Sequence, residues 1–153
     1  MSPAPIFFHQ RVLGRLFRAL SEFVEQHNLG EVVMSPMDVH FTVIDVYQPD
    51  MLFIRKENLP KIDLYDWVRL VPDMVVEVLS PSTKAKDYKR KKIIYGECGV
   101  REYWIVDPKE RTVEILVNEN GEYRRESLLE PPDDLISPMF PGFALSLDKL
   151  FGG

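Results

Sequence analysis

Apolar residues recur at intervals of three and four along the first part of the chain, which is the pattern of an amphipathic helix. They are Val12, Leu13, Leu16, Phe17, Leu20, Phe23 and Val24. Asn28 and Gly30 stand where this pattern ends, and both residue types accept the left-handed conformation that often closes a helix. The sequence therefore predicts a first helix over residues 9–27.

Shorter apolar segments follow, with the two-residue period of half-buried strands. We expect three strands near residues 31–35, 39–46 and 50–54. A fourth, at 73–79, is a nearly continuous apolar run of the kind found in central strands that are buried on both faces. Between the last two, residues 55–71 show neither period. Long loops in compact domains are often functional, but a surface loop anchored by Trp67 is the simpler interpretation.

The C-terminal half predicts a helix over residues 84–97 and a strand over 102–106, and then two hairpin strands over 112–117 and 123–128. The tail beyond Pro131 has no period, although its apolar residues favour packing onto the body of the protein. The predicted fold is α/β (α+β): a mixed sheet flanked by helices, with core order αβββαβ and a C-terminal β-hairpin extension. A length of 153 residues suits a single domain, residues 1–153.

Composition narrows the setting of the protein. The single cysteine, Cys98, allows no internal disulfide, so we expect a reducing, cytoplasmic environment. No segment approaches the ~20 consecutive apolar residues of a membrane span, so we expect no membrane contact. The net charge of −5 argues against a surface built for nonspecific nucleic-acid binding.

An acid in the fourth strand is the first candidate for chemistry. Glu77 lies in the middle of the apolar run, where a carboxylate is unfavourable unless a metal, a base or a proton compensates it. In the following helix, Asp87, Lys91 and Tyr95 are spaced four residues apart and share one face. Lys91 therefore points to the same side of the fold as the apolar stripe. A buried structural ion pair between Glu77 and Lys91 is the alternative interpretation.

A second acid, Asp50, introduces the third strand. If the two strands are neighbours, Asp50 and Glu77 can converge on one hard cation such as Mg²⁺, which prefers oxygen ligands and retains several waters. Lys91 could then stabilise negative charge that develops during phosphodiester hydrolysis. Alternatively, Asp50 is only a turn residue that follows Pro49 at a strand edge.

A run of basic residues accompanies Lys91 along the same helix. It consists of Lys84, Lys86, Lys89, Arg90 and Lys92. These side chains could lie along nucleic-acid phosphates, although a solvated helix face explains the run equally well.

These motifs also carry a resemblance. Pro49-Asp50, followed 27 residues later by Glu77 with a lysine nearby, resembles the PD-(D/E)xK restriction-endonuclease-like superfamily. The longer phrase PDMVVEVLSPST and the later EYWIVDP resemble the Uma family of restriction endonucleases, a bacterial family. Between them stand Asp87, Lys91, Tyr95 and Gly99-Val100. The resemblance extends from His9 to Pro141-Gly142.

The resemblance implies an endonuclease that hydrolyses DNA with Mg²⁺ or Mn²⁺. Asp50 and Glu77 match the two metal-binding acids, and the backbone carbonyl of Val78 is the expected third ligand. Leu79 occupies the position at which the superfamily pattern has its lysine, and Lys91 matches a lysine displaced to the following helix. The fold also permits a homodimer. A nucleic-acid- or protein-binding module without catalytic turnover is the alternative function.

Four further residues are candidates for a supporting shell around this site. His9 and Gln10 match the start of the first helix in the family, although a histidine at a helix start is more often structural or solvated. Asp87 is also suited to capping its helix. Tyr95 is also suited to the core.

Overall fold

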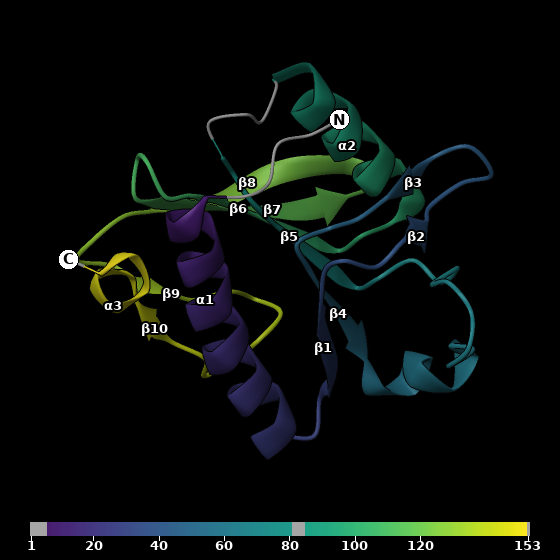
Figure 1. The fold of residues 1–153 in the computed structure, drawn as a ribbon, viewed down its shortest axis with the longest axis horizontal. Coiled ribbons are helices and arrows are strands. Elements are labelled where there is room, and N and C mark those ends of the chain that lie inside the picture. The colour runs from purple at the N-terminus through teal and green to yellow at the C-terminus, as the bar shows by residue number, and fades with distance from the viewer. Residues whose placement is uncertain (1–5, 81–84, 153) are drawn as a thin grey trace.

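A six-stranded mixed sheet separates two helices in the computed structural model, which describes residues 6–80 and 85–152, with the side chains of 85–87 excepted (Figure 1). The helices are α1 (Phe7–Gln26), η1 (Lys56–Lys61, a 3-10 helix), α2 (Ala85–Cys98) and α3 (Leu147–Phe151). The strands are β1 (Gly30–Met34), β2 (Val39–His40), β3 (Val46–Tyr47), β4 (Met51–Arg55), β5 (Met74–Val78), β6 (Glu102–Asp107), β7 (Thr112–Glu119), β8 (Glu122–Leu129), β9 (Asp134–Leu135) and β10 (Leu145–Ser146). Among the described residues, no helix has both the length and the apolar content needed to cross a bilayer.

The strand order of the main sheet is β1-β4-β5-β6-β7-β8. β5 and β6 are parallel, joined through α2, and the other neighbours are antiparallel. The chain therefore forms α1, three strands, α2 and β6 in the predicted αβββαβ order, and β7 and β8 form the predicted hairpin extension. All five residues of β5 are buried, which confirms that it is a central strand.

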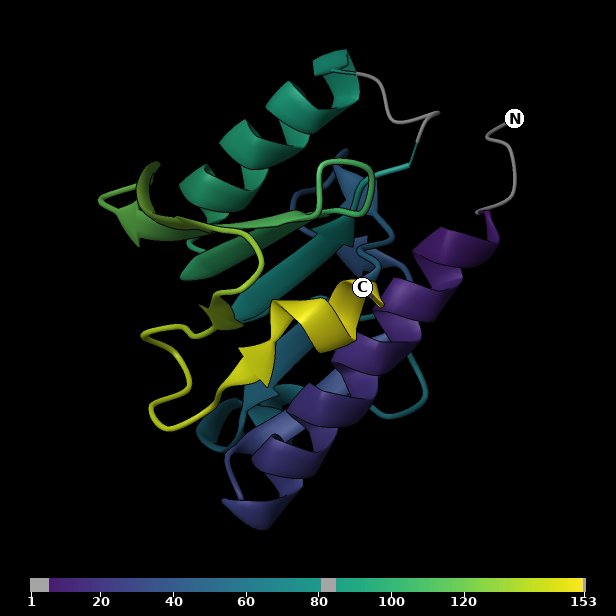
Figure 2. The same ribbon diagram turned by 90° about the vertical axis from the view of Figure 1, so that its left-hand side faces the viewer.

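Alternate residues of β5 supply two separate cores, because successive side chains of a strand point to opposite faces. Val76 and Val78 pack on the side covered by α1 and α3. Val75 packs on the side covered by α2, with Tyr95 and Tyr103. Figure 2 shows α2 on one side of the sheet, and α1 with α3 on the other.

The strand predicted over residues 39–46 is wrong as a continuous element. The structure has instead a small hairpin of β2 and β3 outside the main sheet, with Val43 at its tip 98% exposed. The Thr42 hydroxyl accepts hydrogen bonds from the backbone N–H groups of Ile44 and Asp45 and donates one to the Asp45 carboxylate. Such local side-chain bonds stabilise a turn in place of a sheet ladder.

The excursion between β4 and β5 begins with η1 and ends at Asp73. Its predicted anchor was wrong by one residue: Trp67 is 56% exposed and stacks on His40, whereas Val68 is buried and bridges to β2. Asp73 accepts hydrogen bonds from the backbone N–H of Arg55 (2.7 Å) and from the Asn58 side-chain amide, so it fastens the two ends of the excursion together.

The C-terminal tail packs onto the sheet as expected, through the buried Phe140 and Phe143. It also contains β9, β10 and α3, which the sequence did not predict. These elements have two to five residues, too few for a hydrophobic period to be visible. The Ser146 hydroxyl caps α3 by accepting a hydrogen bond from the N–H of Lys149.

We expect Gly96→Ala to destabilise the protein by about 1–3 kcal/mol, because α2 approaches the β7–β8 turn at this glycine. A Cβ at Gly96 would lie 2.7 Å from the Gly121 carbonyl oxygen and 3.3 Å from the Tyr123 ring. Gly14→Ala in α1 is the matched control: its Cβ would meet nothing within 4 Å, so it should stabilise the protein by up to about 1 kcal/mol. Urea unfolding of both variants measures the difference, and equal effects at the two positions would contradict the packing argument.

Candidate active site

The antiparallel register of β4 and β5 brings the two predicted acids together. Leu52 pairs with Val75 and Met51 with Val76. Extending this register by one residue places Asp50 opposite Glu77. Directly opposed residues of an antiparallel pair lie on the same face of a sheet. The backbone N–H of Val78 donates a 2.7 Å hydrogen bond to Oδ2 of Asp50, which fixes this carboxylate against the end of β5. Asp50 is therefore bound to the neighbouring strand and is not merely a turn residue after Pro49.

The Glu77 carboxylate lies between β5 and α2 and is 8% exposed. The Tyr95 hydroxyl donates to Oε1 at 2.9 Å, and Nζ of Lys91 lies 3.7 Å from the same oxygen. Burial raises the pKa of Glu77 to about 7; the Lys91 charge opposes this shift, and the Asp50 charge adds to it. The carboxyl group therefore exchanges its proton near neutral pH.

Lys91 and Tyr95 reach Glu77 from one face of α2, in agreement with their fourfold spacing. The ammonium of Lys91 also lies 5.8 Å from the centre of the Tyr47 ring, a cation–π contact. Tyr95 packs edge-on against Tyr47 and is fully buried. The side chain of Asp87, the third residue of the predicted face, lies outside the described part of the chain.

His9 joins the site from the start of α1. It is 5% exposed, and its Nε2 lies 3.5 Å from Oδ2 of Asp50. Its Nδ1 shares a 3.0 Å hydrogen bond with Oε1 of Gln10. The bond to Asp50 raises the pKa of His9 against the effect of burial, and hydrogen bonding to the backbone of Val78 acts in the same direction. The structure thus brings the buried His9 to Asp50, so His9 is not solvated. Gln10 is exposed and reaches the site only through its hydrogen bond with His9.

The donor set suits a hard divalent cation. Among the described residues, no hydrogen bond or ion pair engages Oδ1 of Asp50 or Oε2 of Glu77, so one oxygen of each acid has no protein partner. No group of three or more His, Cys, Asp and Glu side chains forms a metal site in residues 6–80 and 85–152. Mg²⁺ does not need such a group, because two carboxylates, a backbone carbonyl and waters suffice.

The basic run on α2 is only partly available for phosphates. Arg90 forms a 2.8 Å ion pair with Asp45 and so ties α2 to the β2–β3 hairpin. Lys89 is exposed and Lys92 is half-buried. Lys84 and the side chain of Lys86 lie outside the described residues.

A residue that the sequence analysis did not select, Tyr47, completes the surroundings of Lys91. Its ring contacts Phe41, Tyr95 and the Lys91 ammonium. The sequence feature that could have pointed to Tyr47 is its position three residues before Asp50. Its side chain faces α2 only because of the β2–β3 hairpin, which the sequence did not predict.

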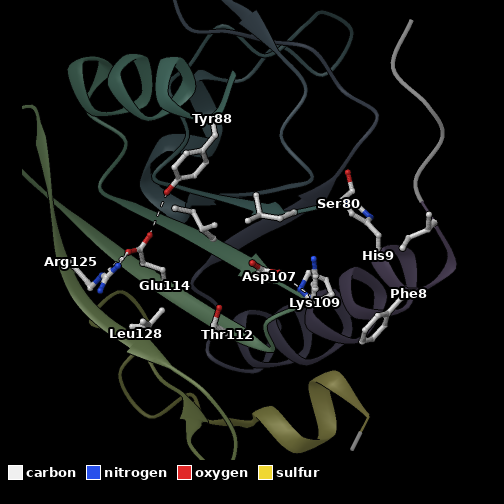
Figure 3. A pocket seen from close by; sticks show the side chains of 14 residues that line it. Phe8, His9, Ser80, Tyr88, Asp107, Lys109, Thr112, Glu114, Arg125 and Leu128 are labelled. Carbon is white, nitrogen blue, oxygen red and sulfur yellow. Dashed lines mark hydrogen bonds and ion pairs between the residues drawn. The ribbon is translucent and has the colours of Figure 1, made fainter. Parts of the chain in front are cut away.

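A cleft of about 880 Å³ opens beside His9, at the carboxyl ends of β5 and β6. Figure 3 shows Phe8, His9 and Ser80 at one end of the cleft, and Tyr88, Glu114 and Arg125 at the other. Oε2 of Glu114 accepts two 2.6 Å contacts from Arg125, and the Tyr88 hydroxyl donates to Oε1 of Glu114 at 3.4 Å. No motif in the sequence pointed to this cleft, because its walls come from five separate elements.

Comparison with known families assigns this chain. The model of the Uma2 family, described as "Putative restriction endonuclease", matches residues 1–148. The chain belongs to the Uma2 family. This match confirms the Uma resemblance carried by the phrases PDMVVEVLSPST and EYWIVDP.

A solved structure has the same fold as this Uma2 protein. It is the crystal structure of a protein from Anabaena variabilis ATCC 29413, described as a putative nuclease belonging to DUF820, and it superposes with a TM-score of 0.82. The alignment covers 99% of this chain and 84% of the other, at 18% sequence identity. At that identity the similarity establishes a shared fold alone. A search of curated proteins found no match.

We expect Glu77→Gln to remove a pH dependence of stability. The pKa of Glu77 in the folded protein, about 7, lies above its ordinary value of 4.5. Stability from the protonated acid is therefore complete below about pH 4.5 and is lost as the pH rises through 7. Between pH 5 and pH 8 this loss amounts to roughly 2–3 kcal/mol, and the glutamine variant should lack it. Urea unfolding in EDTA at pH 5 and pH 8 measures the effect.

The readout is the difference between the parent protein and Glu77→Gln in how their unfolding free energies change with pH. A difference is needed because the raised pKa of His9 also makes stability fall as the pH rises, in both proteins. Glu31→Gln, at an exposed position of β1, controls for the loss of one acidic side chain. Parallel pH profiles for the parent protein and Glu77→Gln would contradict the assignment.

Proposed function

We propose that this Uma2 protein is a metal-dependent endonuclease that hydrolyses DNA phosphodiester bonds. Asp50, Glu77 and the backbone carbonyl of Val78 would hold Mg²⁺ or Mn²⁺, and Lys91 would complete the site. The observation that carries the proposal is the placement of Asp50 opposite Glu77 on paired strands, with Nζ of Lys91 3.7 Å from Glu77.

Neighbouring groups orient each acid. The Val78 N–H and the His9 ring both lie at Oδ2 of Asp50, which leaves Oδ1 for a ligand. The Tyr95 hydroxyl and the Lys91 ammonium both lie at Oε1 of Glu77, which leaves Oε2. Asp50 and Glu77 would hold the divalent cation, which would supply an acidified water molecule and offset negative charge on the phosphate. His9 and Tyr95 are therefore positioning residues in the proposed mechanism.

Lys91 contributes a positively charged side chain to the proposed site, in addition to the metal. The Tyr47 ring and Glu77 hold its ammonium on the inner face of α2, and its side chain is 28% exposed. A preorganised ammonium stabilises negative charge that develops on a phosphate oxygen more effectively than a mobile one. In this role Lys91 acts on the transition state and not on metal affinity.

The alternative function is a binding module without turnover, in which Glu77 and Lys91 form only a structural ion pair. Their 3.7 Å contact and the Arg90–Asp45 pair on the same helix are consistent with it. However, burial raises the pKa of Glu77 despite Lys91. A well-packed apolar side chain would serve a purely structural purpose at least as well. The homodimer and the cytoplasmic location stay predictions from the sequence.

We expect the purified protein to nick supercoiled plasmid in Mg²⁺ or Mn²⁺ and to lose this activity in EDTA. Glu77→Gln should lower the nicking rate by about 10³-fold or more, because the substitution removes a carboxylate ligand from the metal site. The measurement is the conversion of supercoiled to open-circular plasmid over time.

Glu102→Gln is the matched control, since Glu102 is equally buried but binds Trp104 and Ser137, away from the proposed site. This variant should still nick plasmid. Nicking that survives Glu77→Gln would contradict the proposed site. If neither the parent protein nor Glu102→Gln nicks duplex or single-stranded nucleic acid in Mg²⁺ or Mn²⁺, the binding-module function is favoured.

We expect Lys91→Met to separate catalysis from metal binding. Nicking should fall by about 10²–10³-fold, because the charge that stabilises the transition state is lost. Mn²⁺ should still raise the melting temperature of the variant, because both acids remain and a bound metal stabilises the folded state. A variant that nicks normally, or one that no longer responds to Mn²⁺ although the parent protein does, would contradict this role.

A further inference from the structure

The cleft beside His9 adjoins the proposed active site through this histidine, and neither Asp50 nor Glu77 lines it. His9 lines the cleft, and its Nε2 lies 3.5 Å from Asp50. Leu79 and Ser80 also line it, and they directly follow Glu77 and Val78 in the chain. A molecule with its reacting group at the acids would thus have a neighbouring group at the mouth of this cleft.

The walls of the cleft are largely apolar. Ile105 of β6 is 5% exposed, and Leu128 of β8 is 50% exposed. Phe8 of α1, Leu79 and Pro108 add further apolar surface. A volume of about 880 Å³ lies within the range of roughly 300–1,000 Å³ in which proteins bind organic ligands.

The charged side chains that line the cleft include both positive and negative groups. Arg125 is bound to Glu114 at 2.6 Å, and Glu114 also accepts from Tyr88. Lys109 and Asp107 both line the cleft. Phosphate tracks need an excess of positive side chains, which this cleft lacks among its described lining residues. Tyr88, Glu114 and Arg125 instead offer donors and acceptors side by side, at the end of the cleft away from His9 (Figure 3).

We propose that the cleft binds the base of an unpaired nucleotide that neighbours the scissile phosphate. Nucleobases have apolar faces and an edge of hydrogen-bond donors and acceptors, which matches apolar walls with a Tyr88–Glu114–Arg125 cluster at one end. A base in a duplex is paired and stacked, and it can enter such a cleft only after it has been unpaired and turned out of the helix. The substrate class is therefore single-stranded or locally unpaired nucleic acid, DNA or RNA. This inference rests on the proposed nuclease function of the same site.

The test is the binding of fluorescently labelled oligonucleotides, measured by anisotropy in EDTA so that no cleavage occurs. One 12-nucleotide sequence is compared as single-stranded DNA, single-stranded RNA and duplex DNA. We expect at least tenfold tighter binding of a single strand than of the duplex. The DNA and RNA arms identify which sugar is accepted.

Leu128→Trp narrows the cleft and should weaken single-strand binding roughly tenfold. Leu64→Trp makes the same change at an exposed position outside the cleft and should have no effect. Arg125→Ala, at a half-exposed position, removes a donor from the cleft and should also weaken single-strand binding. This second variant tests the proposal even if Leu128→Trp fails to fold.

Equal or tighter binding of duplex would overturn the proposal, and so would unchanged single-strand binding in both Leu128→Trp and Arg125→Ala. The outcome is separable from that of the nuclease proposal. Single-strand binding that depends on Leu128 without any nicking would reject the nuclease and retain the cleft. Metal-dependent nicking with no dependence on Leu128 or Arg125 would retain the nuclease and reject the cleft.

Discussion

The pairing of β4 with β5 is the constraint on which the proposed site depends. Their antiparallel register sets Asp50 opposite Glu77, and the bond from the Val78 N–H to Asp50 continues it past the last ladder pair. Because β5 is central and buried on both faces, helices cover it from both sides. α1 thereby brings His9 to one acid, and α2 brings Lys91 and Tyr95 to the other.

The energetics of this arrangement are dominated by one unfavourable group. A carboxylate in a central strand loses its hydration, and one hydroxyl and one ammonium compensate it only in part, so the pKa of Glu77 stays raised. Buried acids whose charge is only partly compensated are common at sites that bind ions or exchange protons. Natural sequences tend to break local packing rules where function requires it.

The elements with strong periods could be predicted from the sequence, and so could the acids. α1, β5 and α2 were each found to within two residues at either end, and Lys91 was distinguished from its basic neighbours by helical geometry alone. Partners distant in the chain could not be found in this way. Hydrogen bonding by Thr42 overrode the alternation that suggested one strand over 39–46. Tyr47 and the cleft acquire their roles only through tertiary contacts, for which a single sequence carries no local signal.

The spacing of 27 positions between Asp50 and Glu77 along the chain is not required by the geometry of the site. Asp73 binds the Arg55 N–H and the Asn58 amide, so the excursion between the two strands is closed at its base, and its outer part leaves and rejoins the sheet at one point. That outer part can lengthen or shorten without changing the strand register. In related proteins the two acids should therefore be recognised by their places on β4 and β5, whereas a search that fixes their separation along the chain would miss members with a different loop.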